Sequence, residues 1–259
     1  MKIVIFLVSL HPEMRRFALI GKRLGHSYSQ QWFEALFARL GLVDHAYLLR
    51  EMPSLAGLRE WVESEGICGF NVTVPYKQEI VPLLDALDAT AEAVGAVNCV
   101  TVEGGRLVGH NTDAGAFRQS LENTGWPVRQ AFVLGTGGAA RAVAFALRQM
   151  AIPYRFVSRT PHGENQIGYE ELSTLHSPLP TLLVNATPVG MFPDVEGTPL
   201  PDFNFQLSTF NLFDLTYNPS PTRLMRDAMA RGARVKDGLE MLHLQAEMSW
   251  DFYRGVTCG

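Results

Sequence analysis

"QAFVLGTGGAARAVAFALRQM", residues 130–150, is the stretch that decides the fold. An apolar run, a glycine-rich turn and a segment with helical apolar spacing follow one another without a break. Gly135, Gly137 and Ala140 have G-x-G-x-x-A spacing, in which the first glycine permits a tight turn and the second lets backbone approach a pyrophosphate. The alternative is a glycine-rich turn without a ligand. The strand before it and the helix after it favour a dinucleotide site.

The strand after this helix indicates which dinucleotide is bound. It ends in Ser158, Arg159 and Thr160. NAD-binding domains usually carry Asp or Glu here, to hold the ribose hydroxyls. Here no carboxylate would repel a 2′-phosphate, and an arginine can pair with one. The pattern favours NADP, the alternative being an exposed arginine without a role.

Strands and helices alternate on both sides of this unit, which predicts an α/β fold with sheets covered by helices. The predicted strands are 16–21, 45–51, 69–74, 154–160, 181–187 and 210–217, with a hairpin over 97–111. The predicted helices are 29–41, 55–66, 114–125, 223–232 and 239–255. The boundary between two units is expected near Ala114. The last helix follows a complete second unit, so it is expected to return to the first.

Composition limits the classes of function. The net charge is −4 and no run of basic residues occurs, which argues against a nucleic-acid surface. Cys68, Cys99 and Cys258 are odd in number and lack paired spacing, so reduced thiols in the cytoplasm are predicted, without a disulfide framework or zinc site.

The first ten residues, "MKIVIFLVSL", look like the start of a signal peptide, but no small-residue cleavage site follows. They are too few to span a bilayer, so no membrane partner is expected. Whether Met14 is the natural start stays open.

A lysine follows a strand in "GFNVTVPYKQ", residues 69–78. Lys77 comes just after the carboxyl end of that strand, where α/β sheets present ligand-contacting groups. Asp113 ends the predicted hairpin at the junction of the two units, and clefts between domains commonly hold ligands. The two residues could transfer a proton to and from a substrate hydroxyl, or form a structural salt bridge. Spacing alone leaves both interpretations open.

Two serines stand near the start of the predicted helix over 29–41. Ser27 and Ser29 alternate in "GHSYS". Capping of the helix is the better interpretation in isolation. The alternative is a pair of hydroxyl donors to a carboxylate beside a helix N-terminus.

The chain resembles the shikimate dehydrogenase family. The motifs that carry the resemblance occur in order from about Phe17 to Gly255: "GHSYS", "NVTVPYK", "GAVNCV", "HNTDAGAF", "GTGGAAR", "VNATPVGM", "DLTYNPSPT" and "DGLEMLHLQAE". The resemblance implies reversible reduction of 3-dehydroshikimate to shikimate with NADPH, in aromatic amino-acid (chorismate) biosynthesis. It also implies a cytoplasmic enzyme, which would be a monomer or homodimer.

The implied fold is α/β with two domains. An N-terminal mixed-sheet substrate domain would comprise residues 1–113 plus 239–259, because the C-terminal helix returns to it. A Rossmann-type NADP-binding domain would comprise residues 114–238.

The resemblance also implies roles for individual residues. Lys77 and Asp113 match the catalytic pair. Ser27 and Ser29 match the hydroxyls that hold the substrate carboxylate, which reverses the preference for capping. The other implied substrate contacts are Asn71, Thr73, Asn98, Tyr217 and Gln245. The implied cofactor contacts are Gly135, Thr136, Gly137, Gly138, Ala139, Ser158, Arg159, Thr160, Leu215 and Gly238. No metal site is expected.

Two departures from the family pattern concern the cofactor. Gly163 stands where many members carry a second arginine, and Ser158 replaces the usual asparagine, so strict preference for NADP stays open. One alternative is a quinate/shikimate dehydrogenase that uses NAD, but such relatives often have an acidic residue after the second Rossmann strand and an altered "NVT" triplet. Another is a non-catalytic ligand sensor, which loss of the lysine or aspartate would mark. This chain shows neither sign.

Overall fold

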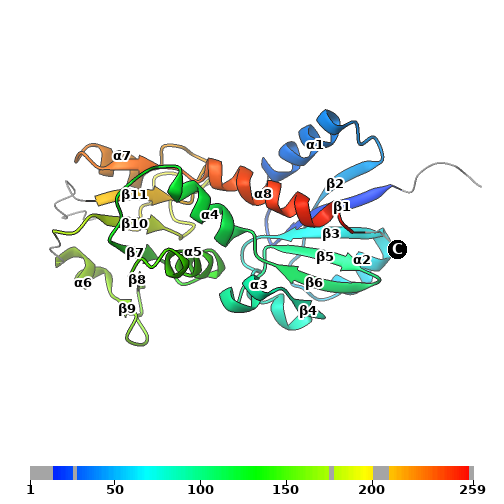
Figure 1. Cartoon of the computed structure of the whole chain (residues 1–259), viewed down its shortest axis with the longest axis horizontal. Coiled ribbons are helices and arrows are strands. Elements are labelled where there is room, and N and C mark those ends of the chain that lie inside the picture. Colours follow the sequence, from blue (N-terminus) through cyan, green and yellow to red (C-terminus); the bar gives the residue numbers. More distant parts are fainter. Residues whose placement is uncertain (1–13, 26–27, 175–177, 201–209, 257–259) are drawn as a thin grey trace, which may run out of the picture.

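The computed structural model describes residues 14–25, 28–174, 178–200 and 210–256. Within these ranges the chain forms two six-stranded sheets, called sheet A and sheet B, each with its own helices (Figure 1). This arrangement agrees with the predicted α/β fold. No helix of the described part is long and apolar enough to cross a membrane.

Sheet A comes from the first 110 residues and is mixed, with strand order β2-β1-β3-β5-β6-β4. Its first three strands pair in parallel, whereas β5 is antiparallel to both β3 and β6. Its strands are β1 (Arg15–Gly21), β2 (His45–Glu51), β3 (Ile67–Val72), β4 (Ala86–Leu87), β5 (Cys99–Glu103) and β6 (Arg106–His110). Its helices are α1 (Tyr28–Leu40), α2 (Leu58–Glu65) and α3 (Ala89–Val94), with a 3-10 turn at Val81–Leu83.

Sheet B is parallel throughout its described strands, with order β12-β11-β10-β7-β8-β9. The order reverses between β7 and β10, and ligands of such sheets bind at the carboxyl ends beside that point. Its strands are β7 (Gln130–Leu134), β8 (Tyr154–Val157), β9 (Gln166–Ile167), β10 (Thr181–Asn185), β11 (Phe210–Asp214) and β12 (Arg234–Lys236). Its helices are α4 (Asp113–Glu122), α5 (Gly138–Gln149), α6 (Tyr169–Thr174) and α7 (Arg223–Met229).

Side chains alternate between the two faces of β1 and β3, as a strand buried on both faces requires. Phe17 and Leu19 pack in a cluster with α1, whereas Ala18 and Ile20 pack on the opposite face with α2. On β3, Phe70 and Val72 share the α2 face. The polar position between them, Asn71, therefore faces the other way.

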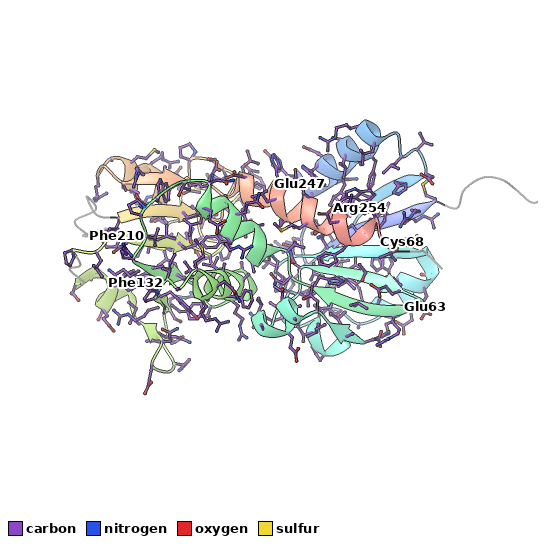
Figure 2. All side chains as sticks on the ribbon, in the orientation of Figure 1. Glu63, Cys68, Phe132, Phe210, Glu247 and Arg254 are labelled. Carbon is purple, nitrogen blue, oxygen red and sulfur yellow. The ribbon has the colours of Figure 1, made fainter. Side chains whose placement is uncertain are left out.

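Helix α8 (Leu239–Tyr253) joins the two parts of the molecule, running from α4 beside sheet B to the face of sheet A (Figure 1). Figure 2 labels Glu247 in its second half and Arg254 directly after its last residue. The ring of Tyr253 stacks on Phe17 with centroids 4.9 Å apart. A Cβ on Gly69 would lie 2.7 Å from that ring, so only glycine fits below it. The expected return of the last helix is confirmed.

Several details differ from the sequence prediction. Strand β3 ends at Val72, two residues before Val74. The short elements β4, β9, β12 and α6 carry too few residues to show a period, and none was predicted. The expectation of reduced thiols is confirmed for Cys99, which is free, and is wrong for Cys68, which is disulfide-bonded; Cys258 lies outside the described residues. The residues proposed as an N-terminal extension, 1–13, also lie outside them.

Candidate active site

A cleft with a cavity volume of about 290 Å³ lies between the two sheets. It is lined from the sheet A side, from the sheet B side and from α8. The sequence-predicted residues that line it are Ser29, Asn71, Thr73, Lys77, Asn98, Asp113, Ala139, Leu215, Tyr217, Gly238 and Gln245. Ser27 lies outside the described residues. The structure therefore brings most of the predicted site together in one cavity.

Lys77 and Asp113 form an ion pair in this cleft, with 2.7 Å between Nζ and Oδ2. Lys77 lies in the turn that follows β3, and Asp113 is the first residue of α4. Their side chains are 17% and 6% exposed. An ion pair that lines a cavity can exchange a proton with a bound ligand, which a pair enclosed by protein cannot do.

The amide of Asn98 fixes the orientation of Asp113. Its Nδ2 donates to Asp113 Oδ1 at 3.0 Å and to Thr112 Oγ1 at 2.8 Å. Its Oδ1 accepts from the backbone N–H of Thr112 at 2.7 Å. Asn98 is 2% exposed, so all three of these bonds are buried. The second carboxylate oxygen of Asp113 remains directed at Lys77.

A second amide, Asn71, connects this group to α8. Its Oδ1 accepts from the hydroxyl of Tyr47 at 2.8 Å, and its Nδ2 donates to Ser249 Oγ at 2.9 Å. Burial raises the pKa of Tyr47 well above its ordinary value, so this hydroxyl keeps its proton and donates. Ser249 in turn donates to the carbonyl oxygen of Gln245 at 2.8 Å and lies 3.3 Å from Thr112 Oγ1.

Sequence reasoning missed Tyr47, Thr112 and Ser249 as parts of this network. Thr112 carried a signal, since it stands inside the "NTD" motif. Tyr47 in β2 and Ser249 in α8 occupy positions that read as ordinary core. Only the tertiary structure brings their hydroxyls to Asn71.

The remaining described substrate residues of the prediction, Ser29, Thr73, Tyr217 and Gln245, also line the cleft. Ser29 is in the first turn of α1 and is 9% exposed. The ring of Tyr217 meets the edge of Tyr28 with centroids 5.3 Å apart, and burial raises its pKa. Gln245 Nε2 donates to the carbonyl of Leu242 at 2.8 Å, which holds its side chain against α8.

The glycine turn packs against Lys77. Gly135 has φ 100°, and α5 begins at Gly138. A Cβ on Gly138 would lie 2.8 Å from Lys77 Cβ, whereas a Cβ on Gly137 would meet nothing within 4 Å. The turn is therefore close-packed on the lysine side and open at Gly137, the position at which a pyrophosphate would approach the backbone. These residues fit a dinucleotide cofactor.

The predicted 2′-phosphate residues follow β8. Arg159 and Thr160 are exposed. Ser158 Oγ donates to the carbonyl of Thr160 at 3.1 Å, so its hydroxyl closes the turn. Gly163 has φ 86°, a left-handed conformation that an arginine adopts only with strain. Arg159 is therefore exposed in this loop, where its guanidinium could pair with a phosphate.

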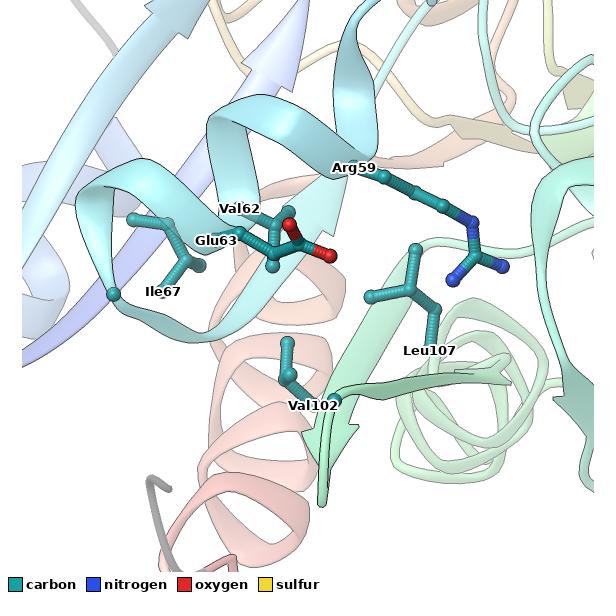
Figure 3. Close-up of a pocket in the computed structure, with 8 residues that line it drawn as sticks. Arg59, Val62, Glu63, Ile67, Val102 and Leu107 are labelled. Carbon is teal, nitrogen blue, oxygen red and sulfur yellow. The ribbon is translucent and has the colours of Figure 1, made fainter.

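A second hollow, of about 100 Å³, lies between α2 and the β5–β6 hairpin (Figure 3). Arg59 and Glu63 project over it from α2, above Val102 and Leu107. Arg59 already donates to both carboxylate oxygens of Asp85, at 2.9 and 3.1 Å. None of the described predicted site residues lines this hollow. The described residues also contain no group of three or more His, Cys, Asp or Glu able to hold a metal.

Known proteins match both the sequence and the fold. The family model of the shikimate dehydrogenase substrate binding domain matches residues 19–100. The shikimate dehydrogenase (NADP(+)) of Shouchella clausii is 36% identical over 93% of each chain. Shikimate dehydrogenase 1 from Peptoclostridium difficile has a TM-score of 0.85 and 32% identity, covering 95% of this chain and 94% of that one. Shikimate 5-dehydrogenase from Thermus thermophilus, in complex with NADP(H) and shikimate, has a TM-score of 0.82 and 34% identity over 95% of each chain. The chain belongs to the shikimate dehydrogenase family.

Proposed function

We propose that this protein is an NADP-dependent shikimate dehydrogenase, which reversibly reduces 3-dehydroshikimate to shikimate in chorismate biosynthesis. The observation that carries the proposal is the Lys77–Asp113 ion pair, which lines the cleft and contacts the glycine turn. A proton-transfer pair thus lies next to the site that fits a nicotinamide dinucleotide. Substrate and cofactor would meet at the lysine.

The proposed chemistry follows from charge. The bound nicotinamide supplies the hydride. Hydride addition to a carbonyl leaves an alkoxide unless a proton arrives, and protonated Lys77 donates that proton from Nζ. Asp113 holds the ammonium group in place through its Oδ2. In the reverse direction the neutral lysine takes the proton from the substrate hydroxyl.

The substrate roles proposed for the lining residues follow the family pattern. Ser27 and Ser29 would hold the carboxylate. The hydroxyls of the ring would contact Asn71, Thr73 and Asn98 from sheet A. From the other side the substrate would contact Tyr217 and Gln245. The cleft that contains the described members of this set supports these roles.

The domain division is proposed at the start of α4, with residues 1–113 and 239–259 forming the substrate domain and 114–238 the cofactor domain. The separate hydrogen-bonded sheets and the return of α8 support it. A cytoplasmic location is proposed from the biosynthetic role alone. The cysteines do not support it, because Cys68 is disulfide-bonded and disulfides are rare in cytosolic proteins.

The test is turnover by the purified protein. Shikimate or quinate is supplied with either NADP⁺ or NAD⁺, and the absorbance of the reduced nicotinamide is followed. Turnover that is faster with NADP⁺ is expected. Binding of shikimate without turnover would indicate a ligand sensor, and faster turnover of quinate with NAD⁺ would indicate the quinate-dehydrogenase alternative.

A further inference from the structure

A buried carboxyl group lies behind the cleft and takes no part in the proton transfer described above. Asp214 ends β11 and is 0% exposed. No ion pair among the described residues includes it. A carboxyl group buried without a cation is costly, so its retention calls for a role.

Three hydrogen-bond donors from three separate segments converge on Asp214. Its Oδ1 accepts from Asn185 Nδ2 at 2.9 Å and from the backbone N–H of Thr216 at 3.0 Å. Its Oδ2 accepts from Thr222 Oγ1 at 2.8 Å. Asn185 ends β10, Thr216 follows β11, and Thr222 caps α7. One side chain therefore ties the carboxyl ends of two strands to the start of a helix.

The segments tied in this way form the sheet B side of the cleft. Asn185 Oδ1 accepts from both the N–H and the hydroxyl of Thr187, at 3.1 and 2.7 Å, which fixes residues 186–188. Residues 215–217 follow Asp214 directly, and both segments line the cavity. Next to them, a Cβ on Gly238 would lie 2.1 Å from the carbonyl oxygen of Leu215, so the wall has no room for adjustment there.

We propose that Asp214 is a positioning residue that holds segments 186–188 and 215–217 together as the wall against which the nicotinamide end of the cofactor binds. The proposal rests on the proposed function for the identity of the ligand. It assigns Asp214 no contact with substrate or cofactor.

The chemistry of Asp214 distinguishes two substitutions. Desolvation raises its pKa despite the hydrogen bonds from Thr216, Thr222 and Asn185. An uncharged amide therefore suits this environment. In Asp214→Asn, Oδ1 keeps its two donors and Nδ2 donates to Thr222 Oγ1. Asp214→Ala loses all three bonds.

The experiment compares Asp214→Ala and Asp214→Asn with the control Asn211→Ala. Asn211 lies on the same strand, three residues before Asp214 and further from the cleft, and is also buried. Its Oδ1 accepts from Arg234 Nε, so it takes no part in the bonds of Asp214. Hydrogen exchange of the ligand-free proteins is measured first. Asp214→Ala should exchange at least about tenfold faster at the backbone amides of Ala186, Thr187 and residues 215–217, because the bonds that close these segments are lost. Asp214→Asn and Asn211→Ala should not.

Kinetics and cofactor binding complete the test. For Asp214→Ala we expect kcat to fall about tenfold and the Kd of NADPH, from fluorescence titration, to rise several-fold. Asn211→Ala should lower Tm with both values unchanged. Unchanged exchange and Kd in Asp214→Ala, or equal losses in Asn211→Ala, would overturn the proposal.

A second pair covers the case in which Asp214→Ala does not fold. Thr222→Val removes the donor to Oδ2 at nearly constant volume, whereas Thr222→Ser keeps it. Exchange in 215–217 should rise in the first variant alone, and equal behaviour of the two would contradict the proposal. Because exchange is read without ligand, a wild type that binds NADPH but does not turn over shikimate would contradict the proposed function and leave this test decisive.

Discussion

The two sides of the cleft are built differently. On the sheet A side, Asn71, Asn98 and Asp113 are buried and bonded to one another. On the sheet B side, the turn at 135–139 and the loop at 158–160 are half-buried or exposed. With the proposed roles, a small polyhydroxylated substrate would meet preformed side chains, whereas a long cofactor would meet open backbone and one arginine. The buried bonds on this side lie behind the cleft, at Asp214, which is bonded to Asn185, Thr216 and Thr222.

The strongest test of this contrast is Lys77→Ala. A general acid–base group contributes about 10²–10⁴-fold, so kcat should fall within that range while the KM for shikimate changes much less. Steady-state kinetics measures both. Lys236→Ala is a matched control, because Lys236 also pairs with a carboxylate, Glu240, outside the cleft. An unchanged kcat in Lys77→Ala would reduce the ion pair to a structural salt bridge.

Ser249→Ala tests whether the buried network on the sheet A side acts as a unit. The change removes the acceptor of the Thr112 hydroxyl and one of the two acceptors of Asn71 Nδ2, which keeps only the carbonyl of Asn98, at a cost of about 1–3 kcal/mol. We expect kcat/KM for shikimate to fall about tenfold and the KM for NADP⁺ to stay constant, since the network contacts Asp113 through Asn98.

Ser120→Ala is the control for Ser249. It is equally buried and donates to Glu240 on α8 at 2.9 Å, outside the cleft. In urea unfolding the Ser120→Ala variant should lose as much free energy of unfolding as Ser249→Ala, whereas its kcat/KM for shikimate should equal that of the wild type. Similar losses of kcat/KM in both variants would show that the packing of α8, and not the buried network, controls the Lys77–Asp113 ion pair.

Arg159→Ala tests the open side of the cleft. Loss of an exposed charge-assisted bond should raise the KM for NADP⁺ about fivefold, equivalent to about 1 kcal/mol, and leave the KM for NAD⁺ unchanged. Arg155→Ala, four residues earlier and paired with Glu171, should alter neither. Equal effects on both cofactors would remove Arg159 from phosphate recognition.

Gly163→Ala tests whether backbone conformation governs this loop. With φ at 86°, an alanine should destabilise the protein by about 1–2 kcal/mol in urea unfolding. Gly168→Ala is the control, because Gly168 lacks a positive φ and has open space around it. If the two variants were equally stable, the missing arginine would be a simple substitution and not a requirement of the turn.

The pH dependence of Asp214 is the smallest expected effect. Because its pKa in the folded protein is raised above the ordinary value of 3.8, the folded state binds more protons and loses stability as pH rises through that window. Asp214→Asn lacks this loss. The free energy of unfolding of the variant relative to wild type should therefore increase with pH above 3.8 and then level off. A difference that is constant with pH would contradict a raised pKa.

The sequence predicted the helices, the strands and the residues at the ends of strands better than it predicted the side-chain hydrogen bonds that join these elements. Lys77 and the glycine turn were found because each follows an apolar run, and local pattern marks such places. Tyr47 and Ser249 were not found, because each bonds Asn71 from a distant part of the chain, and a lone polar residue in a strand or helix has no periodic signature. Asp214 stood in the motif "DLTYNPSPT" together with Thr216 and Thr222, but the motif did not show that both threonines donate to Asp214. The family resemblance supplied residues such as Asn98, but not the bonds that orient it.

The position of α8 bears on how the chain folds as it is made. Arg15 donates to the carbonyl of Tyr253, 238 residues later, and Phe17 packs under that same tyrosine. Sheet B lies wholly between these two ends and can close its core first. Sheet A is begun first on the ribosome and completed last. Until α8 emerges, the part of the α1 face of sheet A that Tyr253 covers, at Phe17 and Gly69, stays open to solvent, so sheet A reaches its full core only when synthesis is nearly complete.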